Sequence, residues 1–420
     1  MISYNKAFFS RIKDYLIIFF VFIFPISGAL ANLLLSLILI LWIMEGGWQE
    51  KKRILLNNRL VWIIFGILIF LLISTIFSDT YTGNFLNNHG TRNEYQFILQ
   101  HLFRLYMVFI VLITSKFDYL TLVKSFLLGV FISEIVSYSI FFHLIDVNYF
   151  KQLHLLSSNA SYSNPTPFMH HSLYSIFLTT AILLTLDNFF NFKGFLKILA
   201  TIFLISATIN LFINGGRVGQ LALVISITVY FTAKFKNLKM ILLSLFSLFL
   251  IYLTAYNLSP IFQKRANEAV NSLKNVIKHQ NYCTSWGQRI GMDIVGINIL
   301  IQNPKNFIFG LGAGDAQKKL LDFGYKNYKK ITKCFEKQQH LHNQYLQLWI
   351  DGGIFEIFLL IAYFIYLYKY APSPLTLSII SVFAFSFISD VILYRSKTIL
   401  LFFIISAILL KRFENKKQML

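Results

Sequence analysis

Charged side chains at the ends of long apolar runs are the first residues of this sequence that could do chemistry, because such positions are costly unless they serve a function. Arg217 ends the turn 214–217 (NGGR), and Arg289 follows Ser285, where we expect a helix to begin. Glycine turns and helix N-termini present backbone N–H groups to anions, and a guanidinium group binds phosphate well. The alternatives are a snorkelling Arg217 at a capping turn and an ordinary surface Arg289.

A second polar group, which contains His340, His342 and Asn343, precedes the apolar run that starts at Tyr345. A neutral imidazole at the mouth of a membrane can act as a general base near neutral pH. Two histidines spaced by two residues face different ways in a helical turn and the same way in an extended segment. Their spacing therefore does not decide whether they act together. The alternative is that Asn343 caps a helix and the histidines are bystanders.

Further ionisable residues lie near or within other apolar runs. Asp390 and Arg395 flank the turn before the last run, where a local ion pair is the simplest explanation. Arg104 and Glu134 lie deeper in their runs, and we expect them either to pair with each other or to line a cavity. The pair 170–171 (HH) precedes another run and is a weaker candidate.

The composition tells which elements must position these residues. The 420 residues are 56% hydrophobic and only 13% charged, whereas a soluble domain is about 25% charged. A spanning helix needs roughly 20 apolar residues, so twelve would use about 240 residues. These values argue against a soluble enzyme and exclude a disordered chain, collagen and a disulfide-rich secreted scaffold. They predict an all-α polytopic membrane protein.

The apolar runs give about twelve membrane spans. The first run, 15–44, is too long for one helix, and Pro25 and Gly28 predict a helical hairpin. The other runs are 60–77, 97–114, 119–144, 172–190, 195–213, 218–233, 238–256, 345–370, 375–388 and 398–410. We therefore divide the chain into nine N-terminal spans (1–256), a long polar loop (257–344) and three C-terminal spans (345–420).

The net charge is +20, and the distribution of the basic residues among the loops predicts how the chain is oriented in the membrane. In a soluble protein this excess would indicate nucleic acid, but in a membrane protein Lys and Arg gather in short cytoplasmic loops. Placing both termini in the cytoplasm puts most basic residues of the short loops inside and the 257–344 loop outside. This loop has thirteen Lys or Arg against five Asp or Glu. Its basicity indicates either an anionic partner or ordinary solubility.

The 257–344 loop also carries local structure signals. Ser259-Pro260 predicts a helix start, and a second helix is expected from Ser285 to Ile301, before Asn303-Pro304. The run 310–314 (GLGAG) lacks the GxGxxG order and predicts a turn, not a nucleotide loop. The two cysteines, Cys283 and Cys334, both lie in this loop. An oxidising exterior would allow a disulfide between them, and two free thiols are the alternative.

The predicted topology brings the reactive residues to one side of the membrane. These residues, which come from separate segments of the outer face, are Arg217, Arg289, His342, Asp390 and Arg395. Several cations beside one histidine are typical of a site that binds a pyrophosphate leaving group and deprotonates a hydroxyl.

The ordered motifs resemble the O-antigen ligase family, within the superfamily that also holds O-antigen polymerases and bacterial protein O-oligosaccharyltransferases. The resemblance covers most of the chain. The matching motifs are 214–219 (NGGRVG), 262–269 (FQKRANEA), 287–292 (GQRIGM), 303–304 (NP), 310–312 (GLG), 340–343 (HLHN) followed by 352–353 (GG), and 389–396 (SDVILYRS). One departure is Gly216, where family members often carry a hydroxyl residue.

The resemblance implies a metal-independent, GT-C-like glycosyltransferase that needs no cofactor and has its active site on the periplasmic side of the Gram-negative inner membrane. Its donor would be a glycan on undecaprenyl pyrophosphate, and its acceptor a hydroxyl of the lipid A-core. The protein would be surrounded by membrane lipids and would not bind nucleic acid. Arg217 and Arg289 would hold the pyrophosphate, and His342 would deprotonate the acceptor, which gives an inverting reaction. The residues expected to bind substrate are His340, Asn343, Asp390, Arg395 and Arg104.

Three alternatives remain open at this stage. An O-antigen polymerase or a protein O-oligosaccharyltransferase would share the donor and differ in the acceptor. A polyprenyl-glycan or solute transporter would keep a basic cavity but would not need His342. Turnover by purified protein separates the transporter from the enzymes, and the acceptor separates the enzymes from one another.

Overall fold

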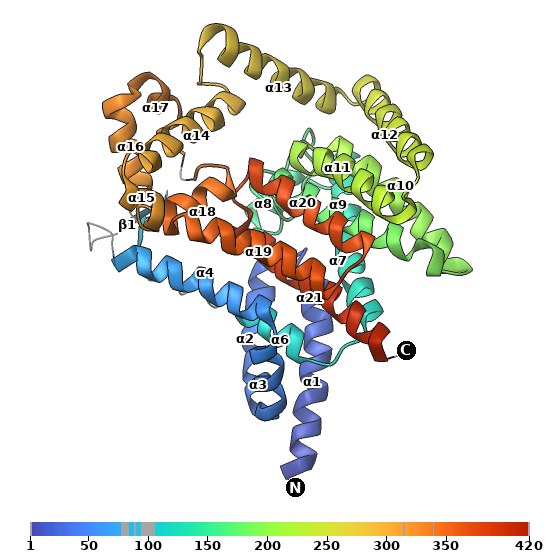
Figure 1. Ribbon diagram of the computed structural model, residues 1–420. Helices are drawn as coiled ribbons and strands as arrows, with labels where there is room; N and C mark the ends of the chain where they lie inside the picture. The colour runs from blue at the N-terminus through green and yellow to red at the C-terminus, as the bar shows by residue number, and fades with distance from the viewer. Residues whose placement is uncertain are drawn as a thin grey trace.

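The computed structural model describes residues 2–76, 84–87, 90–93, 106–313, 316–338 and 340–418. The described part is almost entirely helical (Figure 1). Its only strands, β1 (Asn84–Asn87) and β2 (Gly90–Asn93), form a short antiparallel hairpin.

The N-terminal half begins with the predicted hairpin. Helices α1 (Ile2–Ile23) and α2 (Gly28–Met44) pack side by side and are joined by a turn that contains Pro25. The chain then bends by 114° into the short helix α3 (Trp48–Asn57). The helices that follow are α4 (Arg59–Ile76), α6 (Val108–Thr114), α7 (Tyr119–Phe141), α8 (Val147–Gln152), α9 (His171–Asn188), η2 (Phe189–Asn191), α10 (Phe195–Ile213), α11 (Arg217–Phe235) and α12 (Leu238–Leu258).

The C-terminal half contains five helices from the long polar loop and then the last apolar helices. The loop helices are α13 (Pro260–His279), α14 (Ser285–Ile301), α15 (Pro304–Phe309), α16 (Ala316–Asn327) and α17 (Lys329–Phe335). The helices after them are α18 (Gln344–Gly352), α19 (Ile354–Tyr370), α20 (Pro374–Ser389), η3 (Ile392–Tyr394) and α21 (Ser396–Gln418).

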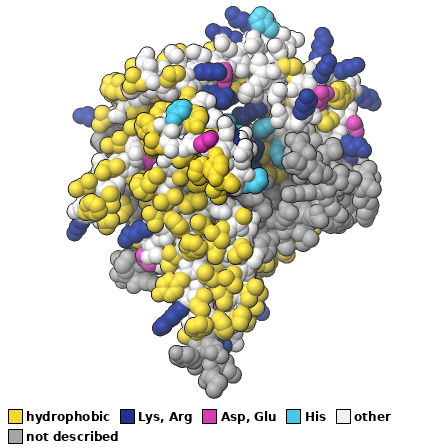
Figure 2. Space-filling view, turned by 180° about the vertical axis from the view of Figure 1, so that it is seen from behind, with side chains coloured by type: hydrophobic (Ala, Val, Ile, Leu, Met, Phe, Trp, Pro, Cys, Tyr) yellow, Lys and Arg dark blue, Asp and Glu magenta, His cyan; other side chains and the backbone are white. Residues whose placement is uncertain are grey.

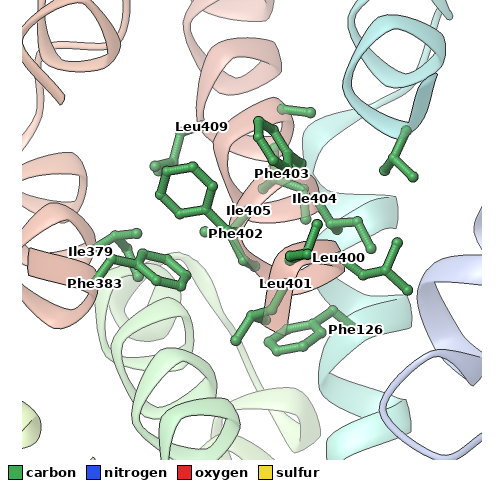
Figure 3. Close-up of a cluster of buried hydrophobic side chains, with 14 of the residues drawn as sticks. Phe126, Ile379, Phe383, Leu400, Leu401, Phe402, Phe403, Ile404, Ile405 and Leu409 are labelled. Carbon is green, nitrogen blue, oxygen red and sulfur yellow. The ribbon is translucent and has the colours of Figure 1, made fainter. Parts of the chain in front are cut away.

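The core of the bundle forms around α21, which packs against α6 and α7. Phe402 and Phe403 of α21 are buried, and the Phe402 ring lies 5.0 Å from that of Phe383 on α20 (Figure 3). A helix that is apolar around its whole circumference is buried in a large core or in a membrane. The sequence of α21 from Ile399 to Leu410 has this character, and nearly all of its side chains there are inaccessible to solvent.

The number of membrane spans is only partly established. Within the described residues, five helices are long and apolar enough to cross a membrane: α7, α9 with η2, α10, α11 and most of α12. The bent pair α2–α3 would make a sixth. Helices α2, α19 and α20 have only 17, 17 and 16 residues, near the lower limit for a span. The described part, which is almost entirely helical, is therefore consistent with a polytopic membrane protein, and the twelve spans stay a prediction.

One predicted span is interrupted. The run 345–370 was expected to form a single helix, but it divides into α18 and α19 at Gly353. Gly353 has a φ of +91°, and a Cβ there would lie 1.9 Å from the carbonyl oxygen of Ile308. A side chain at this position would collide with the backbone, so the close approach of the 308–310 segment breaks the helix.

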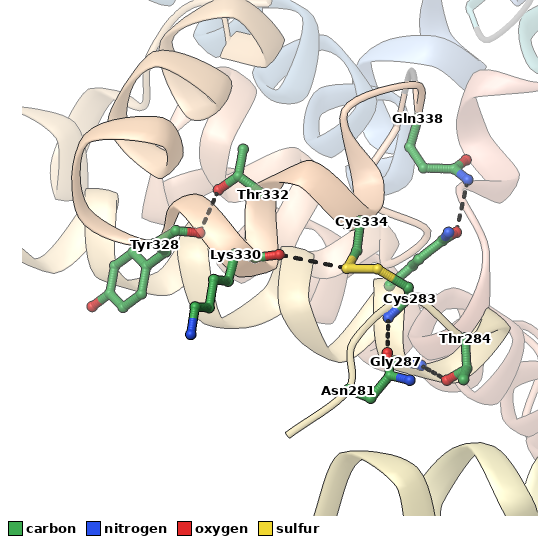
Figure 4. The surroundings of a disulfide bond; sticks show 10 residues. Asn281, Cys283, Thr284, Gly287, Tyr328, Lys330, Thr332, Cys334 and Gln338 are labelled. Atoms are coloured by element: carbon green, nitrogen blue, oxygen red, sulfur yellow. Dashed lines mark hydrogen bonds between the residues drawn. A yellow bond between two sulfur atoms is a disulfide. The ribbon is translucent and has the colours of Figure 1, made fainter. Parts of the chain in front are cut away.

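The loop helices lie together at one end of the bundle (Figure 1). As predicted, α13 begins after Ser259, whose hydroxyl accepts a hydrogen bond from Phe262 N, and α14 extends from Ser285 to Ile301. A disulfide joins Cys283, before α14, to Cys334 on α17 (Figure 4). Seen from behind, Lys, Arg and His side chains gather along this end and in a hollow beneath it, whereas hydrophobic side chains cover most of the described surface below (Figure 2).

Candidate active site

His342 lies in the short segment between α17 and α18 and has an unusual backbone conformation. Its φ of +54° is in the left-handed region, which is uncommon for a residue other than glycine. The residue that follows, Asn343, caps α18 by accepting a hydrogen bond from Leu346 N. The His342 side chain remains 21% exposed, with Nδ1 3.4 Å from Asp390 Oδ1 and Nε2 3.2 Å from Gln338 Oε1. One ring nitrogen thus faces an acid, and the other lies beside a neutral amide.

Asp390, directly after α20, connects His342 to Arg395. Its buried carboxylate accepts a hydrogen bond from Val391 N, 2.8 Å away, and lies 3.5 Å from an Arg395 guanidinium nitrogen. Burial alone would raise the pKa of Asp390. The close contact with His342 and the positive charge of Arg395 outweigh the effect of burial and hold this pKa below its ordinary value. Asp390 is therefore an anion that can orient the imidazole and stabilise its protonated form.

The other histidine of the pair, His340, has a different environment. Its ring packs edge-on against Tyr394, with centroids 6.3 Å apart. Burial, together with the positive charge of the nearby Arg395, lowers the pKa of His340 to about 4. His340 is therefore neutral at physiological pH. The structure brings it close to the charged cluster but does not place it in contact with Asp390.

Asp293, an acid of α14 that the sequence analysis did not identify, connects Arg289 to this cluster. Asp293 lies one helical turn after Arg289, and its carboxylate accepts a hydrogen bond of 3.3 Å from the Asn343 amide. Burial raises the pKa of Asp293 to about 6, although Asn343 and the Arg289 charge act in the opposite direction. Arg289 and Asp293 are four residues apart, which puts their side chains on one helix face. This spacing is the sequence signal that could have indicated Asp293.

Arg217 and Arg289 line a common pocket between the loop helices and the bundle. The other residues of this pocket are His171, Ser172, Gly215, Val218, Leu221, Trp286, Phe385 and Ser389. Arg217 donates a hydrogen bond to the carbonyl oxygen of Arg265 at 3.3 Å, whereas Arg289 forms no ion pair in the described part of the chain. Two guanidinium groups beside apolar side chains such as Phe385 suit a ligand with an anionic and an apolar part.

The turn that carries Arg217 depends on close helix packing. A Cβ at Gly216 would lie 2.4 Å from the Ser175 side chain on α9, so this position has no room for the hydroxyl residue that resembling proteins often carry. The Ser175 hydroxyl lies in that space and accepts a hydrogen bond from Gly219 N at 3.1 Å. The turn is also held from outside by Asn164, which accepts a hydrogen bond from Gly215 N.

Some expectations fall outside this cluster or outside the described residues. Arg104 lies outside the described residues, and so does its expected pairing with Glu134. His171, which we ranked low from the sequence, lines the pocket with the two arginines. Two glutamines were missed: Gln338, beside His342, donates a 3.0 Å hydrogen bond to Gln288 of α14 (Figure 4). Gln288 lies within the motif 287–292, whereas no sequence signal distinguishes Gln338 from other amides of the loop.

Comparison with known proteins gives one family and two relatives. Residues 201–361 match the model of the family described as O-antigen ligase, and they include Arg217, Arg289 and His342. An O-antigen ligase from Escherichia coli (strain K12) is 31% identical over 160 residues, which are 37% of this chain and 36% of that protein. An uncharacterised protein from Haemophilus influenzae is 30% identical over 203 residues, 46% of this chain and 49% of that protein. The chain thus spans less than half of either relative.

Proposed function

We propose that this chain, whose residues 201–361 match the O-antigen ligase family, is a member of that family and transfers a glycan from undecaprenyl pyrophosphate to a hydroxyl of the lipid A-core. The transfer would take place on the periplasmic side of the inner membrane of a Gram-negative bacterium. One observation carries the proposal: His342, held by the buried Asp390, lies in the same cluster as Arg289, which shares a pocket with Arg217. A base and two phosphate-binding cations are what this transfer needs.

In the proposed step, His342 is the general base. The acceptor hydroxyl would replace Gln338 as the partner of Nε2 and lose its proton to this nitrogen. Its oxygen then forms a bond to the anomeric carbon of the donor glycan, from the face opposite the pyrophosphate. Asp390 stabilises the resulting imidazolium, and the proton later leaves to solvent. The configuration at the anomeric carbon is inverted.

Arg217 and Arg289 would act on the leaving group. The bond between the anomeric carbon and the pyrophosphate oxygen breaks, and the electron pair stays with undecaprenyl pyrophosphate. Two guanidinium groups neutralise the negative charge that grows on this oxygen. In the proposed step the arginines supply the positive charge that balances the leaving group, and no metal or cofactor is used. The apolar wall formed by Leu221 and Phe385 would face the first isoprene units of the donor.

The charge distribution supports the orientation. Short basic loops are cytoplasmic when both termini are inside, and this leaves 257–344 with His342 and Arg289 in the periplasm. The resulting division into nine N-terminal spans, one periplasmic loop and three C-terminal spans is part of the proposal. Long loops cross the membrane regardless of charge, so the basic loop agrees with this orientation.

Lipopolysaccharide banding in a ligase-deficient Gram-negative strain with a matched donor and core tests the function. We expect the wild-type gene and a His279→Ala control, which changes an exposed histidine of α13, to restore a long-chain ladder. His342→Ala, present at equal abundance in the membrane, should give none.

Other outcomes of this experiment have defined meanings. Lipid-linked glycans that grow longer without a ladder would indicate the polymerase, and glycosylated protein would indicate the oligosaccharyltransferase. A ladder restored equally by His342→Ala would contradict the assigned base.

A further inference from the structure

A groove at the opposite end of the molecule from the loop helices has no part in the proposed chemistry. It lies between α3 and the beginning of α4, with Tyr106 beside them, and Figure 1 shows α3 near the N-terminal end of the bundle. Its lining residues are Trp48, Lys51, Lys52, Leu55, Leu56, Val61, Trp62 and Tyr106. Two tryptophans, a tyrosine and aliphatic side chains thus surround a groove with lysines at its edge. This composition is typical of the boundary between membrane and water, where aromatic rings and lysines gather.

The apolar side of the groove continues along α4. Trp62 is 51% exposed, and Phe65, Ile69 and Leu72 follow it on the same helix face, each more than a third exposed. The Trp62 and Phe65 rings lie 6.2 Å apart, and those of Phe65 and Tyr106 6.0 Å apart. The ten residue steps from Trp62 to Leu72 cover roughly 15 Å along the helix. This length equals the hydrocarbon thickness of one leaflet, half of about 30 Å.

The two lysines of the groove differ in their partners. The Lys51 ammonium group is buried, lies 2.9 Å from a Glu45 carboxylate oxygen and sits 4.2 Å from the centre of the Trp42 ring. Lys51 is therefore already paired with a carboxylate, which it shares with Lys13. Lys52 is exposed and forms no ion pair within the described residues, and the same is true of its neighbour Arg53. The edge of the groove thus carries positive charge that no carboxylate of the described chain balances.

We propose that this groove binds one anionic phospholipid. The phosphate would lie against Lys52 between the indole rings of Trp48 and Trp62, and an acyl chain would follow the face from Trp62 to Leu72. A zwitterionic lipid would fill the apolar part equally well but would bring its own cation toward Lys52. The charge at the edge therefore selects the headgroup.

Quenching of tryptophan fluorescence by brominated lipids tests this site on the full chain in phosphatidylcholine vesicles. At equal mole fractions, phosphatidylglycerol with brominated chains should quench more strongly than brominated phosphatidylcholine. One basic contact corresponds to a roughly fivefold preference in lipid binding. Lys52→Glu should abolish the preference, and Trp62→Phe should remove most of the phosphatidylglycerol-dependent quenching.

The control is Lys278→Glu, which makes the same charge change at an exposed position of α13 and should keep the preference. Equal thermal stability of Lys52→Glu and wild type will show that the fold is intact. Equal quenching by both lipids in wild type, or a preference that survives Lys52→Glu, would overturn the proposal. Loss of glycan transfer in another assay would not affect it, because the groove takes no part in the proposed chemistry.

Discussion

At the residue scale, the contact between His342 and Asp390 has the most direct consequence for chemistry. A carboxylate that orients a base and stabilises its protonated form matters only while the base is present. Asp390→Asn keeps the size of the side chain and removes its charge, so we expect a slower transfer. His342→Ala should lower the rate by roughly 10²–10⁴. Adding Asp390→Asn to His342→Ala should then cost little more, because the two residues act as a unit.

Initial rates of the wild type, the two single variants and the double variant measure this coupling. The control is Asp322→Asn, which removes an acid of α16 outside the cluster and should leave the rate unchanged. If the effects of Asp390→Asn and His342→Ala multiply independently, Asp390 does not act through His342.

Asp293 gives a prediction about the pH dependence of stability. Burial raises its pKa from the ordinary 3.8 to about 6 in the folded protein. Between these values the folded state binds more protons than the unfolded state, so this residue lowers the stability as pH rises. Asp293→Asn should therefore raise the thermal unfolding temperature at pH 8 and change it little at pH 4. Thermal unfolding in detergent measures both, and an equal shift at the two pH values would contradict the assignment.

At the element scale, the start of α18 joins three parts of the site. Asn343 contacts Asp293 on α14. The Gln344 side chain accepts a hydrogen bond from Leu393 N, 2.7 Å away in the turn after Asp390, and Gln347 accepts one from Leu341 N at 3.0 Å. The two glutamines are buried. This short helix therefore fixes the relative positions of the segments that carry Arg289, Asp390 and His342.

Gln347→Leu tests this positioning role. It keeps a side chain of similar size but leaves Leu341 N without its partner, which costs about 1–3 kcal/mol for a buried group. We expect kcat of the folded protein to fall while KM for the donor changes little, because the arginines are untouched. Gln263→Leu, on the exposed side of α13, is the control. A kcat that stays at the wild-type value in the folded fraction would show that Gln347 only stabilises the fold.

Elements with local signals could be predicted, and those set by tertiary contacts could not. The sequence of α14 contains its own start and a Pro after its end, so the limits Ser285 and Ile301 were predicted correctly. The break at Gly353 was not predicted, because it depends on the backbone near Ile308. Likewise, His342, Asp390 and Arg395 were named from the sequence, and the structure places them in one cluster. The contact between His342 and Asp390, and the roles of Gln344, Gln347 and Asp293, follow only from how distant segments pack.

At the scale of the whole molecule, the two ends of the bundle differ in chemistry. One end carries the basic loop helices with the cluster around His342, and the other carries α3 (Figure 1), which forms the aromatic groove with the beginning of α4. The proposed orientation puts the first in the periplasm and the second in the cytoplasmic leaflet. A pyrophosphate-linked donor is already activated, so the chemistry needs neither a nucleotide fold nor a second domain.

The most direct test is turnover by the purified, reconstituted chain with an undecaprenyl-pyrophosphate-linked glycan and a lipid A-core acceptor. The proposed function predicts that wild type forms the glycosylated acceptor with inverted anomeric configuration, and that His342→Ala is slower by roughly 10²–10⁴ at equal protein concentration. Turnover of His342→Ala at the wild-type rate would contradict it.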